Sequence, residues 1–182
     1  EWHFYPTTLL AQADSCIGSK SSINVGKIKN VLGTFTPPAR VVIGTDVLET
    51  LNEQEIRSGI GEMLKAHAVD GPGSFDQIAA DYYRMIGDKT VLLHYIRQSL
   101  EIKKRIIEED EFDQGVRNIL NYGHSFGHAI ESATNFAVPH GIAVTIGMDM
   151  ANYIAMRLGL MDERNYSRMH SVLAVNYRCY ES

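Results

Sequence analysis

From residue 53 onward, apolar side chains recur at helical spacing, and no other feature constrains the fold of this chain as much. In the segment 53–69, Ile56, Ile60, Met63 and Leu64 fall on one helix face, and the Gly-Pro-Gly turn at 71–73 ends the segment. The same argument predicts helices over 75–85, 91–109, 116–134, 141–158 and the last twenty residues, where Asp162 is the expected N-cap. The sequence therefore predicts a mainly α chain.

The first 52 residues have a mixed character. The β-branched run at 41–43 lies between Pro37-Pro38 and Gly44 and predicts a strand. A short helix is expected over residues 9–13, and a turn-rich lysine segment follows it. We therefore expect a short α/β segment at 1–52 and an all-helical domain at 53–182.

Composition and charge argue against several classes of protein. Lys and Arg number 17 against 22 Asp and Glu, a net charge of −5, and no run of like charges predicts binding to nucleic acid or an anionic membrane. The most apolar stretch, 136–160, is interrupted by Asp149 and Arg157, which favours a buried helix over a membrane span. Cys16 and Cys179 lie far apart, so we expect free thiols in a reducing, cytoplasmic compartment.

The strongest local signal is the segment 121–128, Asn-Tyr-Gly-His-Ser-Phe-Gly-His. Within one helix, Asn121, His124 and His128 at i, i+3 and i+7 would share a face. Two histidines at i and i+4 are an arrangement that binds divalent metals, although paired surface histidines are common in proteins without a metal. Spacing alone leaves both interpretations open.

Two further residues strengthen the metal interpretation. His140 lies between Pro139 and Gly141, at a junction between loop and helix. Glu62 belongs to a mostly apolar helix, where a carboxylate is costly to bury unless it meets a cation. The alternative is an exposed i, i+3 ion pair between Glu62 and Lys65. One carboxylate and two or three imidazoles also form a common ligand set of catalytic zinc.

A second group of residues is basic or carries an amide, and it would suit a phosphorylated, polyhydroxylated substrate. Taken singly, each of these residues is more commonly a solvated side chain. The glycines before Lys20 do not have the spacing of a phosphate-binding Walker loop. The group consists of Lys20, Lys29, Asn30, Lys65, Lys103 and Arg117.

Taken in order along the chain, these motifs resemble those of 3-dehydroquinate synthase and its sugar-phosphate cyclase relatives. The similarity runs from about residue 6 to residue 160. It rests on the motifs Pro6-Thr7-Thr8-Leu9-Leu10-Ala11-Gln12-Ala13-Asp14, Gly18-Ser19-Lys20, Lys29-Asn30, Gly61-Glu62-Met63-Leu64-Lys65, Arg117, Asn121 to His128, and Pro139-His140-Gly141.

The resemblance implies a dehydroquinate synthase-like fold, zinc or cobalt as the metal, NAD as cofactor and a role for each motif residue. The metal ligands are then Glu62, His124 and His140, and His128 transfers protons instead of binding the metal. The catalytic groups are His128, Asp113 and Lys65. The implied substrate contacts are Asp14, Lys20, Asn30, Lys65, Lys103, Arg117 and Asn121. The implied NAD contacts are Thr7, Thr8, Lys29, Val47, Leu48, Glu49 and Thr50.

Four positions differ from the usual family pattern: Ser19, Ala66-His67, Asp113 and Ile142. They leave the implied metal ligands intact and leave the identity of the sugar phosphate open. The most direct expectation is conversion of 3-deoxy-D-arabino-heptulosonate 7-phosphate to 3-dehydroquinate and phosphate in the shikimate pathway, and another sugar-phosphate cyclase is the alternative.

The resemblance also implies that residues 1–52 are a remnant of a nucleotide-binding domain, and that this chain alone is inactive. A homodimer is expected from family habit. Two other functions stay open: a metal-dependent polyol dehydrogenase, for which the phosphate-binding cations have no purpose, and an inactive helical module that keeps a metal site.

Overall fold

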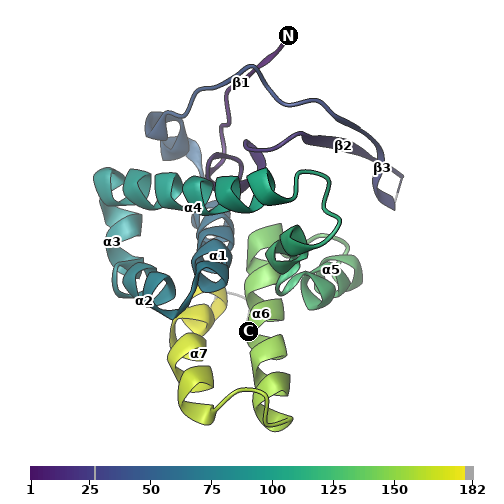
Figure 1. Cartoon of the computed structure of the whole chain (residues 1–182). Helices are drawn as coiled ribbons and strands as arrows, with labels where there is room; N and C mark the ends of the chain where they lie inside the picture. The colour runs from purple at the N-terminus through teal and green to yellow at the C-terminus, as the bar shows by residue number, and fades with distance from the viewer. Residues whose placement is uncertain (27, 179–182) are drawn as a thin grey trace.

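The computed structural model describes residues 1–26 and 28–178, without the side chains of residues 24 and 28–30. Cys179 and the predicted side-chain contacts of Lys29 and Asn30 therefore lie outside the described parts. The elements follow in the order β1 (His3–Phe4), η1 (Ala11–Ser15), β2 (Lys20–Val25), β3 (Ile28–Phe35), β4 (Arg40–Val41), η2 (Thr45–Thr50), α1 (Glu53–Asp70), α2 (Pro72–Ala80), α3 (Tyr82–Gly87), α4 (Lys89–Glu109), η3 (Val116–Asn121), α5 (His124–Ala133), α6 (His140–Arg157) and α7 (Glu163–Tyr177) (Figure 1).

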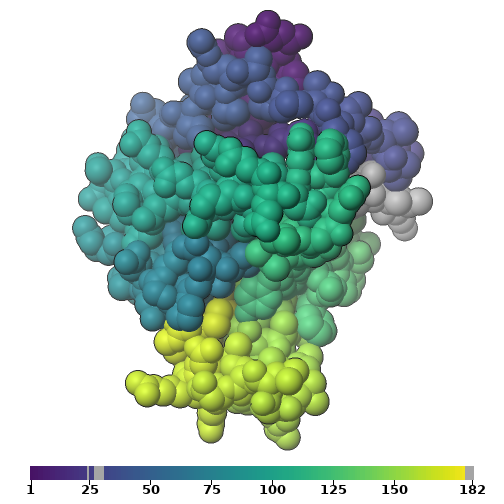
Figure 2. Space-filling view, in the orientation of Figure 1, coloured from purple at the N-terminus to yellow at the C-terminus, as the bar shows by residue number. Residues whose placement is uncertain are grey.

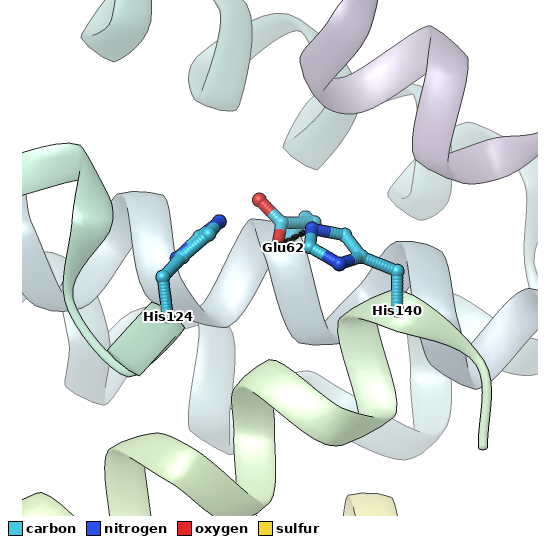
Figure 3. Close-up of side chains that lie close together, drawn as sticks. All are labelled: Glu62, His124 and His140. Atoms are coloured by element: carbon cyan, nitrogen blue, oxygen red, sulfur yellow. Dashed lines mark ion pairs between the residues drawn. The ribbon is translucent and has the colours of Figure 1, made fainter. Parts of the chain in front are cut away.

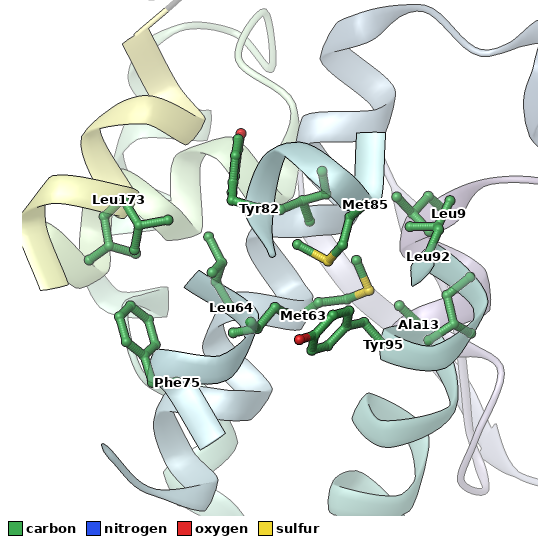
Figure 4. Packing of buried hydrophobic residues seen from close by; sticks show 14 of the residues in the cluster. Leu9, Ala13, Met63, Leu64, Phe75, Tyr82, Met85, Leu92, Tyr95 and Leu173 are labelled. Carbon is green, nitrogen blue, oxygen red and sulfur yellow. The ribbon is translucent and has the colours of Figure 1, made fainter. Parts of the chain in front are cut away.

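Helix α1 is the centre of the fold, because its residues from Ser58 to His67 are all buried. It packs against α2, α4, α6 and α7. Figure 4 shows the core around α1, where Met63 and Leu64 meet side chains from α2, α4 and α7. The described residues among the first 50 lie toward one end of the molecule, and α7 lies at the other (Figure 2). None of the helices among the described residues is long and apolar enough to cross a bilayer.

The predicted helices are confirmed in outline, but two of them, 75–85 and 116–134, are each interrupted in the structure. The side chain of Asp162 accepts a hydrogen bond from the backbone N–H of Asn165, as an N-cap does. The segment 75–85 lies in two helices, α2 and α3. The segment 116–134 is interrupted at Gly123, whose φ of +79° lies in the left-handed region. Asn121 ends η3 before this break and does not share a helix face with the histidines.

The first 52 residues differ most from the prediction. Only Val41 of the predicted strand 41–43 lies in β4, which pairs in parallel with β1. The segment expected to be turn-rich is an antiparallel hairpin, β2–β3. Its apolar side chains are largely exposed, among them Ile23, Leu32 and Phe35. A strand that covers no core does not show the alternation of apolar and polar residues from which strands are predicted.

Helices α1 and α6 touch through their backbones. A Cβ atom on Gly61 would lie 2.3 Å from the carbonyl oxygen of Gly141, and one on Gly141 would lie 1.8 Å from that of Ser58. Any larger residue at either position would push the helices apart. This contact fixes the middle of α1 against the first turn of α6, where Glu62 and His140 lie.

Candidate metal centre

Three side chains from three helices converge at the contact between α1 and α6. Glu62 comes from the middle of α1, while His124 and His140 are the first residues of α5 and α6. One ligand atom from each lies within 4.8 Å of the other two. Figure 3 shows the two imidazoles reaching the Glu62 carboxylate from opposite sides. One carboxylate and two imidazoles in this arrangement fit a zinc ion with a coordination position left open.

The two carboxylate oxygens of Glu62 have different surroundings. Oε2 lies 2.5 Å from Nζ of Lys65, so the pair is an ion pair, but a buried one and not the exposed one considered above. Oε1 is also buried, accepts no hydrogen bond from the described residues and lies 3.7 Å from Nε2 of His140. A buried carboxylate oxygen left in this state is costly unless a cation meets it. The residues present therefore fit a metal ion.

The surroundings of His124 favour a neutral imidazole. Its Nδ1 lies 3.3 Å from the carbonyl oxygen of Tyr122, which favours a proton on Nδ1 and leaves a lone pair on Nε2. Burial, followed by the nearby charge of Lys65, lowers the pKa of the His124 imidazole to about 4. The ring is therefore uncharged at neutral pH, as metal coordination requires.

His128 lies one turn after His124 on α5, with ring centroids 5.2 Å apart. Among the described residues, no group of three possible ligands contains both histidines. His128 groups instead with Glu131 and His140. The structure thus favours the ligand set implied by the resemblance over the simple i, i+4 pair.

A polar cavity of about 460 Å³ opens beside this centre. It brings together residues from η1, β2, α1, α4, the loop after α4, η3, α5 and α6. Nearly all are residues predicted to bind metal or substrate or to take part in catalysis. The lining consists of Asp14, Lys20, Lys65, Lys103, Asp113, Arg117, Leu120, Asn121, His124, His128 and His140.

Cations dominate the wall of this cavity and are held by neighbouring acceptors. Lys103 Nζ lies 2.9 Å from Oδ1 of Asp14 and donates to the Asp14 carbonyl oxygen at 2.7 Å. Burial alone would raise the pKa of Asp14, but Lys103 and Lys65 outweigh it and hold that pKa well below its usual range. Lys20 lies 2.6 Å from Asp113, and Arg117 donates to the carbonyl oxygen of Glu111 at 2.6 Å. This surface suits an anionic ligand.

The sequence comparison assigns the family. The family described as 3-dehydroquinate synthase C-terminal matches residues 59–179, and the family described as 3-dehydroquinate synthase N-terminal matches residues 1–58. The chain belongs to the 3-dehydroquinate synthase family. The two matches meet inside α1, so the division at residue 52 stays a prediction.

Individual members of the 3-dehydroquinate synthase family match most of the chain. It is 41% identical over 170 residues to 3-dehydroquinate synthase of Thermoanaerobacter pseudethanolicus and 42% identical over 170 residues to that of Dictyoglomus thermophilum. Each match covers 92% of this chain and 48% of the relative. The chain therefore spans about half the length of the curated relatives it matches.

Solved structures share the fold. One is 2-epi-5-epi-valiolone synthase from Streptomyces hygroscopicus with NAD⁺ and Zn²⁺ bound, at a TM-score of 0.85 and 26% identity over 96% of this chain and 49% of that one. Another is 2-deoxy-scyllo-inosose synthase complexed with carbaglucose-6-phosphate, NAD⁺ and Co²⁺, at a TM-score of 0.78 and 25% identity over 99% and 49%. The predicted dehydroquinate synthase-like fold is confirmed.

Among the predicted NAD contacts whose side chains the structure describes, Thr7, Thr8 and residues 47–50 do not line the polar cavity. Gln12 is buried and donates to the carbonyl oxygens of Pro6 and Gly44, at 3.1 and 2.9 Å. Its amide thereby ties the Thr7-Thr8 turn to η2, which holds the predicted contacts 47–50. The side chain of Leu48 is buried in the core, so only its backbone is available to a ligand. The roles of these segments stay predictions.

Two carboxylates that shape the site, Asp110 and Glu131, were not predicted from the sequence. Asp110 accepts hydrogen bonds from the backbone N–H groups of Gln114, Gly115 and Arg117 and so shapes the loop before η3. Glu131 is buried next to His140. The signal for Glu131 was present in the sequence, because it follows His128 at i+3 on the same helix.

Proposed function

We propose that the protein containing this chain is a zinc- and NAD-dependent 3-dehydroquinate synthase. It would convert 3-deoxy-D-arabino-heptulosonate 7-phosphate to 3-dehydroquinate and phosphate. The observation that carries the proposal is the position of Glu62, His124 and His140 directly beside a cavity lined by Lys20, Lys65, Lys103 and Arg117. The identity of 41–42% to relatives named 3-dehydroquinate synthase supports the same reaction.

Glu62, His124 and His140 would hold the zinc ion, which when bound polarises substrate oxygens as a Lewis acid. NAD, carried by Thr7, Thr8, Lys29 and residues 47–50, supplies reversible hydride transfer when bound. Solved relatives contain NAD⁺ together with Zn²⁺ or Co²⁺, which supports both assignments.

The cations bind and orient the anionic groups of the substrate. Lys103 and Arg117 are fixed by acceptors in the chain, so their charges are held in place before a ligand arrives. Lys65 is buried between Glu62 and the cavity and would link the metal centre to the substrate. Asp14, Asn30 and Asn121 would hydrogen-bond hydroxyl groups.

Two residues of the cavity suit proton transfer. His128 lines the cavity and is outside the proposed ligand set, so its imidazole would face a bound substrate. Asp113 faces the same space and is paired with Lys20. We assign both to movement of protons at the substrate.

A different sugar-phosphate cyclase is the second candidate, because solved cyclases named for other products share this fold over 96–99% of the chain. The residues that differ from the family pattern favour this second candidate only weakly. Ser19, Ala66 and Ile142 are buried, and none of them lines the cavity. Asp113 alone among those departures faces the substrate space.

The deciding experiment measures phosphate release from 3-deoxy-D-arabino-heptulosonate 7-phosphate, with NAD and zinc present and the product identified by mass. It uses protein that contains this chain at full family length, and Glu62→Gln is the control that removes a metal ligand. Release with formation of 3-dehydroquinate supports the proposal. Absence of release from protein that binds zinc and NAD contradicts it and favours the second candidate. Homodimer formation and a cytoplasmic location remain predictions.

A further inference from the structure

His140 is flanked by two carboxylates, one at each ring nitrogen. Nε2 faces Oε1 of Glu62 at 3.7 Å, and Nδ1 lies 3.2 Å from Oε2 of Glu131, an ion-pair contact that the present orientation of the ring does not make into a hydrogen bond. Glu131 lies on α5 and is only 3% exposed. The cost of burying this second carboxylate is large, and the proposed reaction gives it no role.

The arrangement matches the needs of a neutral imidazole ligand. If Nε2 gives its lone pair to a metal, Nδ1 carries the proton and requires an acceptor. A carboxylate at Nδ1 fixes the tautomer and the ring orientation, and it makes the metal-binding nitrogen more basic. His124 has a neutral acceptor in the corresponding place, the Tyr122 carbonyl oxygen at 3.3 Å.

We propose that Glu131 is a positioning residue. It orients His140 toward the metal and so raises the affinity of the site for the metal. The proposal rests on the metal centre of the proposed function. Because its outer partner is charged, His140 would depend on that partner more than His124 depends on a neutral carbonyl oxygen.

A second metal ion is the competing explanation, since His128, Glu131 and His140 also place ligand atoms within 4.8 Å of one another. The first ion, held by Glu62 and His124, would take Nε2 of His140. A second ion would then need Nδ1 of the same ring. The ring would then have no proton on either nitrogen, a form that neutral imidazole reaches only with strong coordination on both sides. A single ion with an outer carboxylate needs no such state.

The test compares wild-type chain with Glu131→Gln, which keeps the size of the side chain and removes its charge. Glu101→Gln, on the exposed face of α4, removes a carboxylate outside the site and is the matched control. Zinc affinity is measured by competition with a chelator, stoichiometry by elemental analysis, and ligand geometry by the absorption spectrum of the Co²⁺ form. Thermal unfolding of the metal-free proteins shows whether folding is affected.

We expect one zinc per chain and an affinity about 10–100-fold lower in Glu131→Gln, with a changed Co²⁺ spectrum. Glu131→Asp, which keeps the charge, should retain more affinity than Glu131→Gln. A merely structural role would lower the melting temperature of the metal-free protein and leave zinc affinity unchanged, and that result would overturn the proposal. Two zinc ions in the wild type, one of them lost in Glu131→Gln, would make Glu131 a ligand and also overturn it.

The same measurements separate this proposal from the proposed function. A wild-type chain that binds no zinc contradicts the metal centre itself. If the wild-type chain binds zinc, Glu62→Gln loses it and Glu131→Gln binds it with unchanged affinity, the metal centre is supported. The same result shows that Glu131 has no part in metal binding.

Discussion

Nζ of Lys65 lies 2.5 Å from Oε2 of Glu62 inside the packed helices, where the two side chains are 4% and 1% exposed. Burial opposes the charged ammonium, but Glu62 and Asp14 outweigh it and raise the pKa of Lys65. Lys65 and the proposed zinc ion would therefore share one carboxylate. Lys65 stabilises the charge of Glu62 on one oxygen while the other oxygen faces the histidines.

Lys65→Met should destabilise the metal-free chain by about 3 kcal/mol, because it leaves the Glu62 carboxylate buried without its lysine. Zinc should recover part of that loss, since the metal then neutralises the same carboxylate. Urea unfolding with a chelator and with zinc measures both quantities. Lys104→Met is the control, as its ion pair with Glu108 is exposed. Equal destabilisation by the two variants would contradict the argument.

His124→Ala and His140→Ala should each remove most of the bound zinc, whereas His128→Ala should retain it. The reason is that the first two complete the group with Glu62 and the third does not. Elemental analysis of purified chain checks the metal content. In protein of full family length, His128→Ala should slow turnover by about 10²-fold or more. Loss of zinc from His128→Ala would instead support the interpretation in which His124 and His128, at i and i+4, both bind the metal.

Lys103→Ala should lower kcat/KM for the phosphorylated substrate by about 10- to 100-fold, the effect of losing one charge-assisted hydrogen bond. Its neighbour on the same helix provides the control, because Lys104 points to Glu108 and does not line the cavity. Steady-state kinetics with protein of full family length measure the effect. An unchanged kcat/KM in Lys103→Ala would remove this residue from the substrate site.

The stability of the chain should fall as the pH is lowered below about 6.5, the ordinary pKa of histidine, in part because of His67. Burial lowers the pKa of His67 in the folded state, and hydrogen bonds with Met63 and Gln98 offset only part of this effect. The unfolded chain therefore binds the proton first as the pH falls, and protonation favours unfolding.

His67→Gln should show a shallower loss of unfolding free energy than the wild type between pH 7 and pH 5. His94→Gln, which changes an exposed histidine of α4, should follow the wild type. Urea unfolding at a series of pH values, with a chelator present, measures the slopes. Parallel curves for wild type and His67→Gln would show that His67 does not contribute.

Gly141→Ala should destabilise the chain by about 1–3 kcal/mol and weaken zinc binding, because the new Cβ would meet the backbone of Ser58. Gly73→Ala in α2 is the control, since a Cβ there meets nothing within 4 Å and alanine favours the helix. Thermal unfolding and zinc titration measure the two effects. A Gly141→Ala chain with normal stability and affinity would contradict the role given to this contact.

The helices from residue 53 onward were predictable because each buries one face, and burial leaves a periodic pattern in the sequence. The break at Gly123 was not predictable from spacing, because the need for glycine there comes from the approach of α6, where a Cβ would lie 2.6 Å from the side chain of Met148. Spacing within 121–128 therefore suggested one continuous face where the structure has two elements.

The members of the site were predictable as a set, but their spatial relationships were not. The motifs named most of the residues that line the cavity. The burial of the Glu62–Lys65 pair depends on the packing of α6 against α1, which no local sequence pattern predicts. Glu131 follows His128 at i+3, but its contact with His140 on another helix could not be predicted from local spacing.

The three proposed zinc ligands come from α1, α5 and α6, and the contact between the α1 and α6 backbones brings Glu62 and His140 together. No segment shorter than 62–140 contains all three ligands, so tight metal binding has to wait until distant parts of the chain have folded against each other. A change that loosens the packing of α6 on α1, even one far from the ligands, would therefore be expected to lower the affinity of the proposed centre for zinc.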